Sequence, residues 1–132
     1  KGEIGHRSNG VLISTEKGSA MTYALWNIQE RGQLFITPQT EVYQGMIIGK
    51  AAKDLDMEVN PIKNKKLTSI RSSGADDAMK LTPAKIMSLE EALEFIAEDE
   101  LVEITPDSIR IRKRYLTPQE RKQNSKKLVK EN

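Results

Sequence analysis

The sequence predicts an α+β fold with a mainly antiparallel, partly barrel-like sheet, about three helices and one long basic loop. Short runs of β-branched and apolar residues recur about seven times along the 132 residues. About three other stretches have helical spacing or a helix-capping pattern. Strands and helices do not alternate regularly, as they would in a parallel βαβ sheet, so antiparallel pairing is favoured.

Composition narrows the class of protein. The chain has no Cys and one His, which excludes disulfides, thiolate zinc sites and paired-histidine metal sites. No apolar run approaches the ~18 residues that a membrane helix needs. We therefore expect a soluble cytoplasmic protein, monomeric, with no membrane or DNA partner. The first residue is Lys1 rather than Met, so we expect a piece of a longer protein.

The first half of the chain predicts a strand, a helix and a second strand. Residues 11–15 are β-branched and apolar and are followed by a polar turn, which is typical of a strand. Residues 21–31 carry apolar side chains at helical spacing, and Gly32 stands where a C-cap glycine is expected. Residues 33–36 then form a short apolar run before the Pro at position 38.

Two further strands are predicted before the basic segment. Residues 41–52 are rich in strand formers but contain Gly45 and Gly49, which predicts one bent strand. The same glycines superficially resemble a phosphate-binding loop. Only three residues separate them, however, and Ala51 lacks the hydroxyl group that would bind magnesium. Residues 55–59 alternate apolar and acidic side chains, as in a half-buried strand.

Two capping boxes mark helices in the second half. Ser88 and Glu91 form the first, and the helix should run from Leu89 to about position 97 with Leu93 on its buried side. Strands are predicted at 101–104 and 108–114. Thr117 and Glu120 form the second box and open a basic helix. We therefore expect a domain at 1–116 and a basic C-terminal helix or tail at 117–132.

Charge is strongly segregated along this half. Residues 88–105 contain seven acids and no Lys or Arg, whereas residues 110–130 contain nine cations and one acid, Glu120. Either the two blocks face each other inside the domain, or the basic surface faces an anionic partner. The sequence leaves both alternatives open.

Three arginines alternate on the predicted strand at 108–114. Arg110, Arg112 and Arg114 should point from one face about 7 Å apart, close to the phosphate spacing of a nucleic-acid strand. The guanidinium group binds phosphate oxygens in a forked geometry. The alternative is a charged sheet face that pairs with the acidic block. Both interpretations stay open.

The segment at 59–77 has no core pattern. Its cations are interleaved with hydroxyl and amide side chains, which together form a donor set suited to phosphate and ribose. It contains no aromatic residue, so base stacking is not expected and contact with the RNA backbone is favoured. A flexible linker is the alternative, although a loop of this length is usually functional or disordered.

Several long motifs resemble one family, the C-terminal domain of the BipA/TypA translational GTPases. The resemblance covers roughly residues 2–121 and is carried, in the family's order, by GHRSNGVLIS, ALWNIQERGQLFI, EVYQGMIIG, DLDMEVNPIKNKKLTSIRSSGADDA and MSLEEALEFIAEDELVEITPDSIRIRKRYLT. It implies a ribosome-associated protein whose GTP hydrolysis, with GTP and Mg²⁺, belongs to a separate N-terminal domain. It implies no catalytic residue, metal or cofactor in this chain.

The resemblance also implies a binding site. A long loop in the family reaches the acceptor end of A-site tRNA and large-subunit rRNA, with roles in translation under stress and in large-subunit assembly. That loop corresponds to residues 59–77, where Ser69 and Ser72 depart from the common pattern, in which Asn and Ala are usual. The matching candidate RNA-binding residues are Lys63, Lys65, Lys66, Thr68, Arg71, Ser73 and Gly74. A protein-interaction domain that docks through an acidic helix at 88–105 is the alternative function.

Overall fold

The computed structural model describes residues 9–63 and 80–123. Most of the predicted basic loop and the end of the basic tail therefore lie outside the described residues. The strands are β1 (Val11–Ser14), β2 (Gly18–Ser19), β3 (Gly32–Leu34), β4 (Glu41–Val42), β5 (Met46–Ala51), β6 (Met57–Val59), β7 (Glu100–Ile104) and β8 (Ile109–Lys113). The helices are α1 (Thr22–Ile28), the 3₁₀ turn η1 (Gln29–Arg31), α3 (Leu89–Phe95) and a further helix at 118–123.

The predicted α+β class is confirmed. Six strands form one mixed sheet in the order β6-β1-β5-β8-β7, with β3 paired to β5 as well, while β2 and β4 form a separate two-stranded sheet. Every pairing is antiparallel except that of β1 with β6. The described strands do not close into a barrel, because β6 and β7 end the sheet without pairing with each other.

Strand β5 organises the sheet because it has neighbours along both edges. It pairs with β1 on one edge, while β8 and β3 share the other, β8 near Met46 and β3 near Ala51. Five of its six residues are buried. Such a strand needs apolar side chains on both faces, and this explains its nearly continuous hydrophobic sequence.

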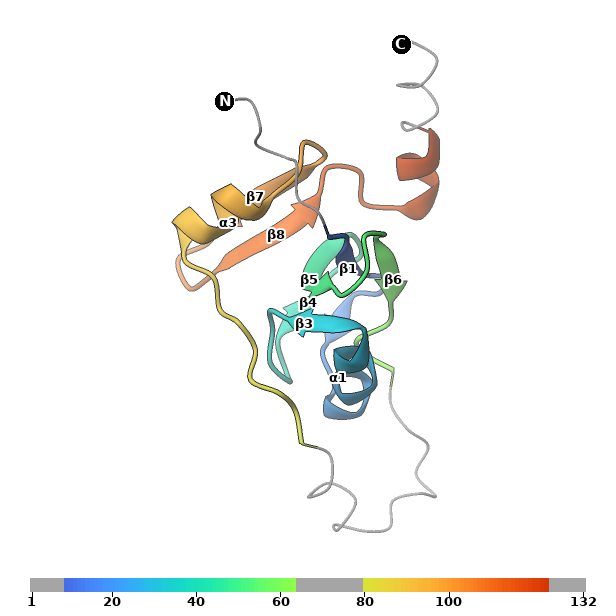
Figure 1. Cartoon of the computed structure of the whole chain (residues 1–132), viewed down its shortest axis with the longest axis vertical. Helices are drawn as coiled ribbons and strands as arrows, with labels where there is room; N and C mark the ends of the chain where they lie inside the picture. The colour runs from blue at the N-terminus through green and yellow to red at the C-terminus, as the bar shows by residue number, and fades with distance from the viewer. Residues whose placement is uncertain (1–8, 64–79, 124–132) are drawn as a thin grey trace.

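The sheet separates two hydrophobic clusters. Leu12 of β1 and Ile48 of β5 pack with Leu25 of α1 on one face. Alternate residues of the same strands, among them Ile13, pack with Ala92 of α3 on the other. Figure 1 accordingly shows α1 at one end of the molecule, beside β3, and α3 at the other, beside β7 and β8. Side-chain alternation along β1 thus holds both helices on one scaffold.

Glycines set the local path of the chain at two predicted positions. Residues 41–52 form two strands rather than the single bent strand expected, with the break at Gly45, whose φ is 93°. A Cβ atom there would lie 2.6 Å from the Leu116 side chain, so only glycine fits both the backbone and the space. Gly32 does follow the helix, but in an extended conformation, since it begins β3.

Both capping boxes are confirmed, but α3 is shorter than predicted. Ser88 accepts a hydrogen bond from the Glu91 N–H, and Glu91 accepts one from the Ser88 N–H. Thr117 and Glu120 form the same reciprocal pair. Helix α3 ends at Phe95, and Leu93 is 48% exposed instead of buried. A helix of two turns buries only a narrow stripe, here centred on Ala92, so Leu93 falls outside it.

Candidate nucleic-acid interface

The basic loop leaves the domain at a firmly held point. At the end of β6, the Pro61 carbonyl oxygen accepts a hydrogen bond from the Met21 N–H at 2.9 Å, just before α1. The Asn60 side-chain oxygen accepts one from the Ile62 N–H at 3.0 Å, which forms a local turn. Pro61 is fully buried. The outgoing end of the loop is therefore fixed against the start of α1.

The returning end is held on the same part of the body. The Gln29 side-chain oxygen accepts hydrogen bonds from the Thr82 N–H at 2.7 Å and from the Thr82 hydroxyl at 2.9 Å. Its amide nitrogen donates to the Lys80 carbonyl at 3.2 Å. The Lys85 N–H then donates to the Leu34 carbonyl of β3 at 2.9 Å. Figure 1 shows the two described ends of the loop on either side of α1.

Only one of the candidate loop residues lies within the described part of the chain. Lys63 is exposed at the outgoing end. The other candidates lie outside the described residues: Lys65, Lys66, Thr68, Arg71, Ser73 and Gly74. Gln29 was not predicted as part of the site. Its contact partners lie 51 and 53 residues away, so no local sequence pattern could identify it.

The arginines of β8 pair inside the domain. Glu103 of β7 lies 3.7 Å from Arg110 Nε and 3.4 Å from Arg112 Nη1. Arg110 also lies over the Tyr43 ring, 5.6 Å from its centroid, and the Tyr43 hydroxyl donates a hydrogen bond to Glu103. Burial and this hydrogen bond to a carboxylate raise the pKa of Tyr43 above its usual value. Of the two interpretations left open, internal pairing is thus observed for two of the three arginines.

The acid that pairs with them comes from β7 and not from α3. Arg114 is exposed and donates to the Glu98 carbonyl oxygen at 3.4 Å. Residues 88–105 are not one acidic helix, because α3 ends at Phe95 and β7 begins at Glu100. The reason is the backbone at Ile96, which turns to the extended conformation. The predicted acidic helix at 88–105 is corrected accordingly.

A buried lysine on the same strand was missed by the sequence interpretation. Lys113 is 3% exposed, and its ammonium lies 2.8 Å from Asp56, 2.9 Å from Asp99 and 2.9 Å from Glu100. Burial alone would lower its pKa, but the three carboxylates outweigh burial and raise it. The sequence held one signal for this buried lysine. Lys113 stands two residues after Ile111, so both side chains lie on the inward side of the strand, opposite the acids that precede β7.

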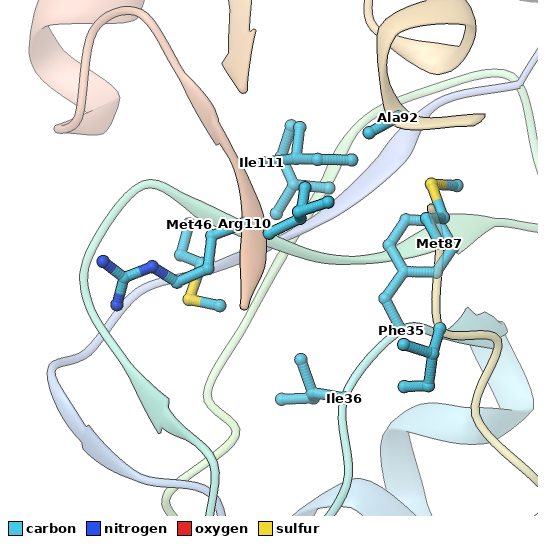
Figure 2. A pocket seen from close by; sticks show the side chains of 10 residues that line it. Phe35, Ile36, Met46, Met87, Ala92, Arg110 and Ile111 are labelled. Carbon is cyan, nitrogen blue, oxygen red and sulfur yellow. The ribbon is translucent and has the colours of Figure 1, made fainter. Parts of the chain in front are cut away.

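The body also contains one small apolar cavity, of about 50 Å³. Figure 2 shows Phe35, Met87 and Ala92 around it, with the Arg110 guanidinium pointing away from Phe35 and Met87. Ligand pockets usually measure roughly 300–1,000 Å³. This cavity is therefore a packing defect between α3 and the sheet and not a site for a substrate.

The segment that resembles a phosphate-binding loop does not fit a nucleotide. The glycine-containing segment is the buried strand β5, so its backbone amides belong to the sheet and cannot cradle a phosphate. Within 9–63 and 80–123, no three His, Asp or Glu residues form a group that could hold a metal ion. In the same ranges, no helix is both long and apolar enough to cross a membrane.

The fold is an α+β domain in which both described ends of the basic segment are hydrogen-bonded to the body around α1 and η1. The family model described as the TypA/BipA C-terminal domain matches residues 9–118, and the chain belongs to this family. It is 56% identical over 121 residues to the large ribosomal subunit assembly factor BipA of Haemophilus influenzae. The proteins of the same name from Buchnera aphidicola and Escherichia coli K12 are 56% and 54% identical.

The match covers most of this chain but little of its relatives. In each of these three comparisons, 92% of the chain is aligned, and it spans 20% of the relative's length. The chain therefore corresponds to the C-terminal domain of these relatives. The GTPase domain that the resemblance implies is not part of these residues.

Proposed function

We propose that this chain is the ribosome- and RNA-binding domain of a factor that assembles the large ribosomal subunit. The relatives' name supports the ribosome as partner. The observation that carries the proposal is the anchoring of both ends of the basic loop on one side of the body, through Pro61 and Gln29. Fixed ends limit the volume that the loop explores, which lowers the entropy cost of binding.

The loop supplies the chemistry that RNA requires. Its lysines and arginine neutralise phosphates, its hydroxyl groups donate hydrogen bonds to phosphate and ribose, and Gly74 lets the backbone approach closely. We infer that it contacts the acceptor end of A-site tRNA and large-subunit rRNA, in a cytoplasmic protein that hydrolyses GTP with Mg²⁺ in another domain. Arg110, Arg112 and Arg114 are weaker contributors, because Glu103 already holds the first two.

The experiment removes the charge of the loop and measures binding to large ribosomal subunits. A variant with Lys63, Lys65, Lys66 and Arg71 changed to Ala should bind more weakly, with an unchanged unfolding temperature. Its log–log salt dependence should flatten by roughly one unit per lost phosphate contact. The matched control changes the exposed Lys17, Lys50, Lys53 and Lys122 to Ala, which removes the same charge elsewhere. Equal binding by the loop variant and this control would refute the proposal.

A protein-docking function through residues 88–105 is the second candidate. It is favoured by Leu93 and Ile86, which are 48% and 70% exposed at and before α3. Changing Glu90, Glu94 and Glu98 to Lys separates the two functions. The RNA-binding proposal predicts unchanged or tighter binding to ribosomes, because positive charge is added. Loss of binding in this variant, with the loop variant unaffected, would favour protein docking.

A further inference from the structure

A groove of about 380 Å³ opens beside the point where the basic loop leaves the body. One wall is α1 with η1, which contribute Tyr23, Asn27 and Arg31, and the other is the end of β6 with Asn60 and Lys63. Figure 1 shows α1 next to the end of β6, where the chain enters the loop. The groove and the candidate RNA-binding loop therefore share a residue, Lys63.

The charge of this groove is positive. Arg31 and Lys63 are exposed, and neither forms an ion pair with another described residue. The acid in the lining, Glu58, is bound by Arg121 at 2.9 Å from the C-terminal helix. Its negative charge is thus neutralised from outside the groove. Two cations without an acidic partner among the described residues, beside an acid that Arg121 already binds, complement a phosphate group.

The rest of the lining suits a nucleobase. The floor is apolar, since Ala24, Ile28 and Val59 are buried side chains. Tyr23 provides an aromatic ring, on which any base can stack. The side-chain oxygen of Asn60 is held by the Ile62 N–H, so its amide nitrogen is the group left to donate to a base edge. A volume of this size lies within the range of small-molecule sites.

We propose that this groove binds one unpaired nucleotide of the RNA that the basic loop contacts. Tyr23 stacks on the base, Asn60 faces its edge, and Arg31 and Lys63 bind the flanking phosphates. This inference rests on the proposed RNA-binding function and adds a preference for single-stranded nucleotides. Recognition of unpaired bases by aromatic and amide side chains is the usual route to sequence-sensitive RNA binding. The loop lacks an aromatic residue, and the groove provides one next to it.

The test compares two RNAs by fluorescence anisotropy with the full chain. One is a blunt hairpin, and the other is the same hairpin with an unpaired adenosine extension. The extension should tighten binding about tenfold, the order expected for stacking of one base. Tyr23→Leu and Arg31→Ala should abolish this preference, whereas Tyr23→Phe should keep it because the ring remains. Lys53→Ala, an exposed lysine outside the groove, is the matched control and should behave as the wild type.

The outcomes separate the groove from the loop. A loop variant that keeps Lys63 and changes Lys65, Lys66 and Arg71 to Ala should weaken binding to both RNAs by the same factor and retain the preference for the extension. Equal binding of the two RNAs by the wild type, or a preference that survives in both Tyr23→Leu and Arg31→Ala, would overturn the groove proposal. Failure of the wild type to bind either RNA would overturn it too. None of these results changes the outcome expected in the ribosome-binding experiment, which tests the proposed function separately.

Discussion

Two groups of cations in this domain have opposite surroundings. On β8, Arg110 and Arg112 share Glu103, and the ammonium of Lys113 contacts three carboxylates. At the root of the basic loop, Arg31 and Lys63 have no such partner among the described residues. A cation that is already neutralised gains little from a phosphate, because the existing ion pair must be broken first. Counting the charged residues of a sequence is therefore not enough to locate a binding surface.

The register of the sheet explains the difference. Residues directly opposite on antiparallel strands are close enough to interact strongly. Glu103 stands opposite Arg110, and Glu100 stands opposite Lys113. The acids and bases that are separate blocks in the sequence are therefore brought together by the β7–β8 hairpin. Among the described residues that line the groove at the loop root, the acid is Glu58, and Arg121 already binds it.

The largest expected effect is on stability, from loss of the buried cation on β8. Lys113→Ala leaves Glu100, whose side chain is 0% exposed, without its cation. Removing one partner of a buried pair costs about 3–5 kcal/mol, and urea unfolding measures this loss. Lys85→Ala is the control, because its ion pair with Glu91 is exposed and should contribute little. Equal losses in both variants would contradict the structural role of Lys113.

Stability should also depend on alkaline pH. The pKa of Lys113 is raised above its usual value of 10.5 by its carboxylate partners, so the folded state holds this proton more tightly than the unfolded state. Its contribution is complete below about pH 10.5 and is lost as pH rises through the folded pKa. Thermal unfolding measured from pH 9 to 12 should show this fall, and Lys113→Met should flatten it. If the unfolding temperature of Lys113→Met falls with pH as steeply as that of the wild type, groups other than Lys113 cause the fall.

A smaller effect is expected at the returning end of the loop. Gln29→Ala removes the acceptor of both Thr82 hydrogen bonds, at a cost of about 1 kcal/mol. Because the loop is then held at one end only, binding to large subunits should weaken several-fold. Gln119→Ala, at an exposed position of the C-terminal helix, is the control for the loss of a surface amide. Unchanged ribosome binding by Gln29→Ala would show that anchoring this end does not matter for function.

The smallest expected effect is on ribosome affinity, from removing the paired arginines of β8. It tests directly whether the two groups of cations differ in function. Arg110→Ala with Arg112→Ala should change ribosome affinity far less than the loop variant does. Glu103→Gln, which frees both arginines, should instead tighten binding about two- to fivefold, corresponding to roughly 0.5–1 kcal/mol of electrostatic energy. Sedimentation with large subunits measures both. A large loss in the double arginine variant would show that β8 is itself an RNA-binding surface.

Local patterns predicted most of the elements. The capping boxes at Ser88 and Thr117 located two helices, a β-branched apolar run identified β1, and alternation identified β8. The features that were missed depend on contacts between distant residues. The parallel pairing of β1 with β6, the clamp from Gln29 to Thr82 and the carboxylates around Lys113 join segments far apart in the chain. Propensity and periodicity carry no information about such contacts.

Composition and the family resemblance mark residues 59–77 as a candidate RNA-binding loop. This remains a prediction, since most of the segment lies outside the described residues. The groove beside it was missed because its lining comes from α1, η1 and β6, whose residues have ordinary helix and strand patterns. Tyr23 in particular has the spacing of a core residue of α1. Only the placement of α1 against the end of β6 brings its ring next to Lys63.

Amide hydrogen exchange of the chain, alone and bound to large ribosomal subunits, decides which surface meets RNA. Protection should appear at residues 59–77 and along α1 and η1 from Tyr23 to Arg31, with the β7–β8 hairpin unchanged. This result would place the loop and the groove at its root against the ribosome. Protection confined to residues 88–105, or absent from residues 59–77, would contradict the proposed RNA-binding surface.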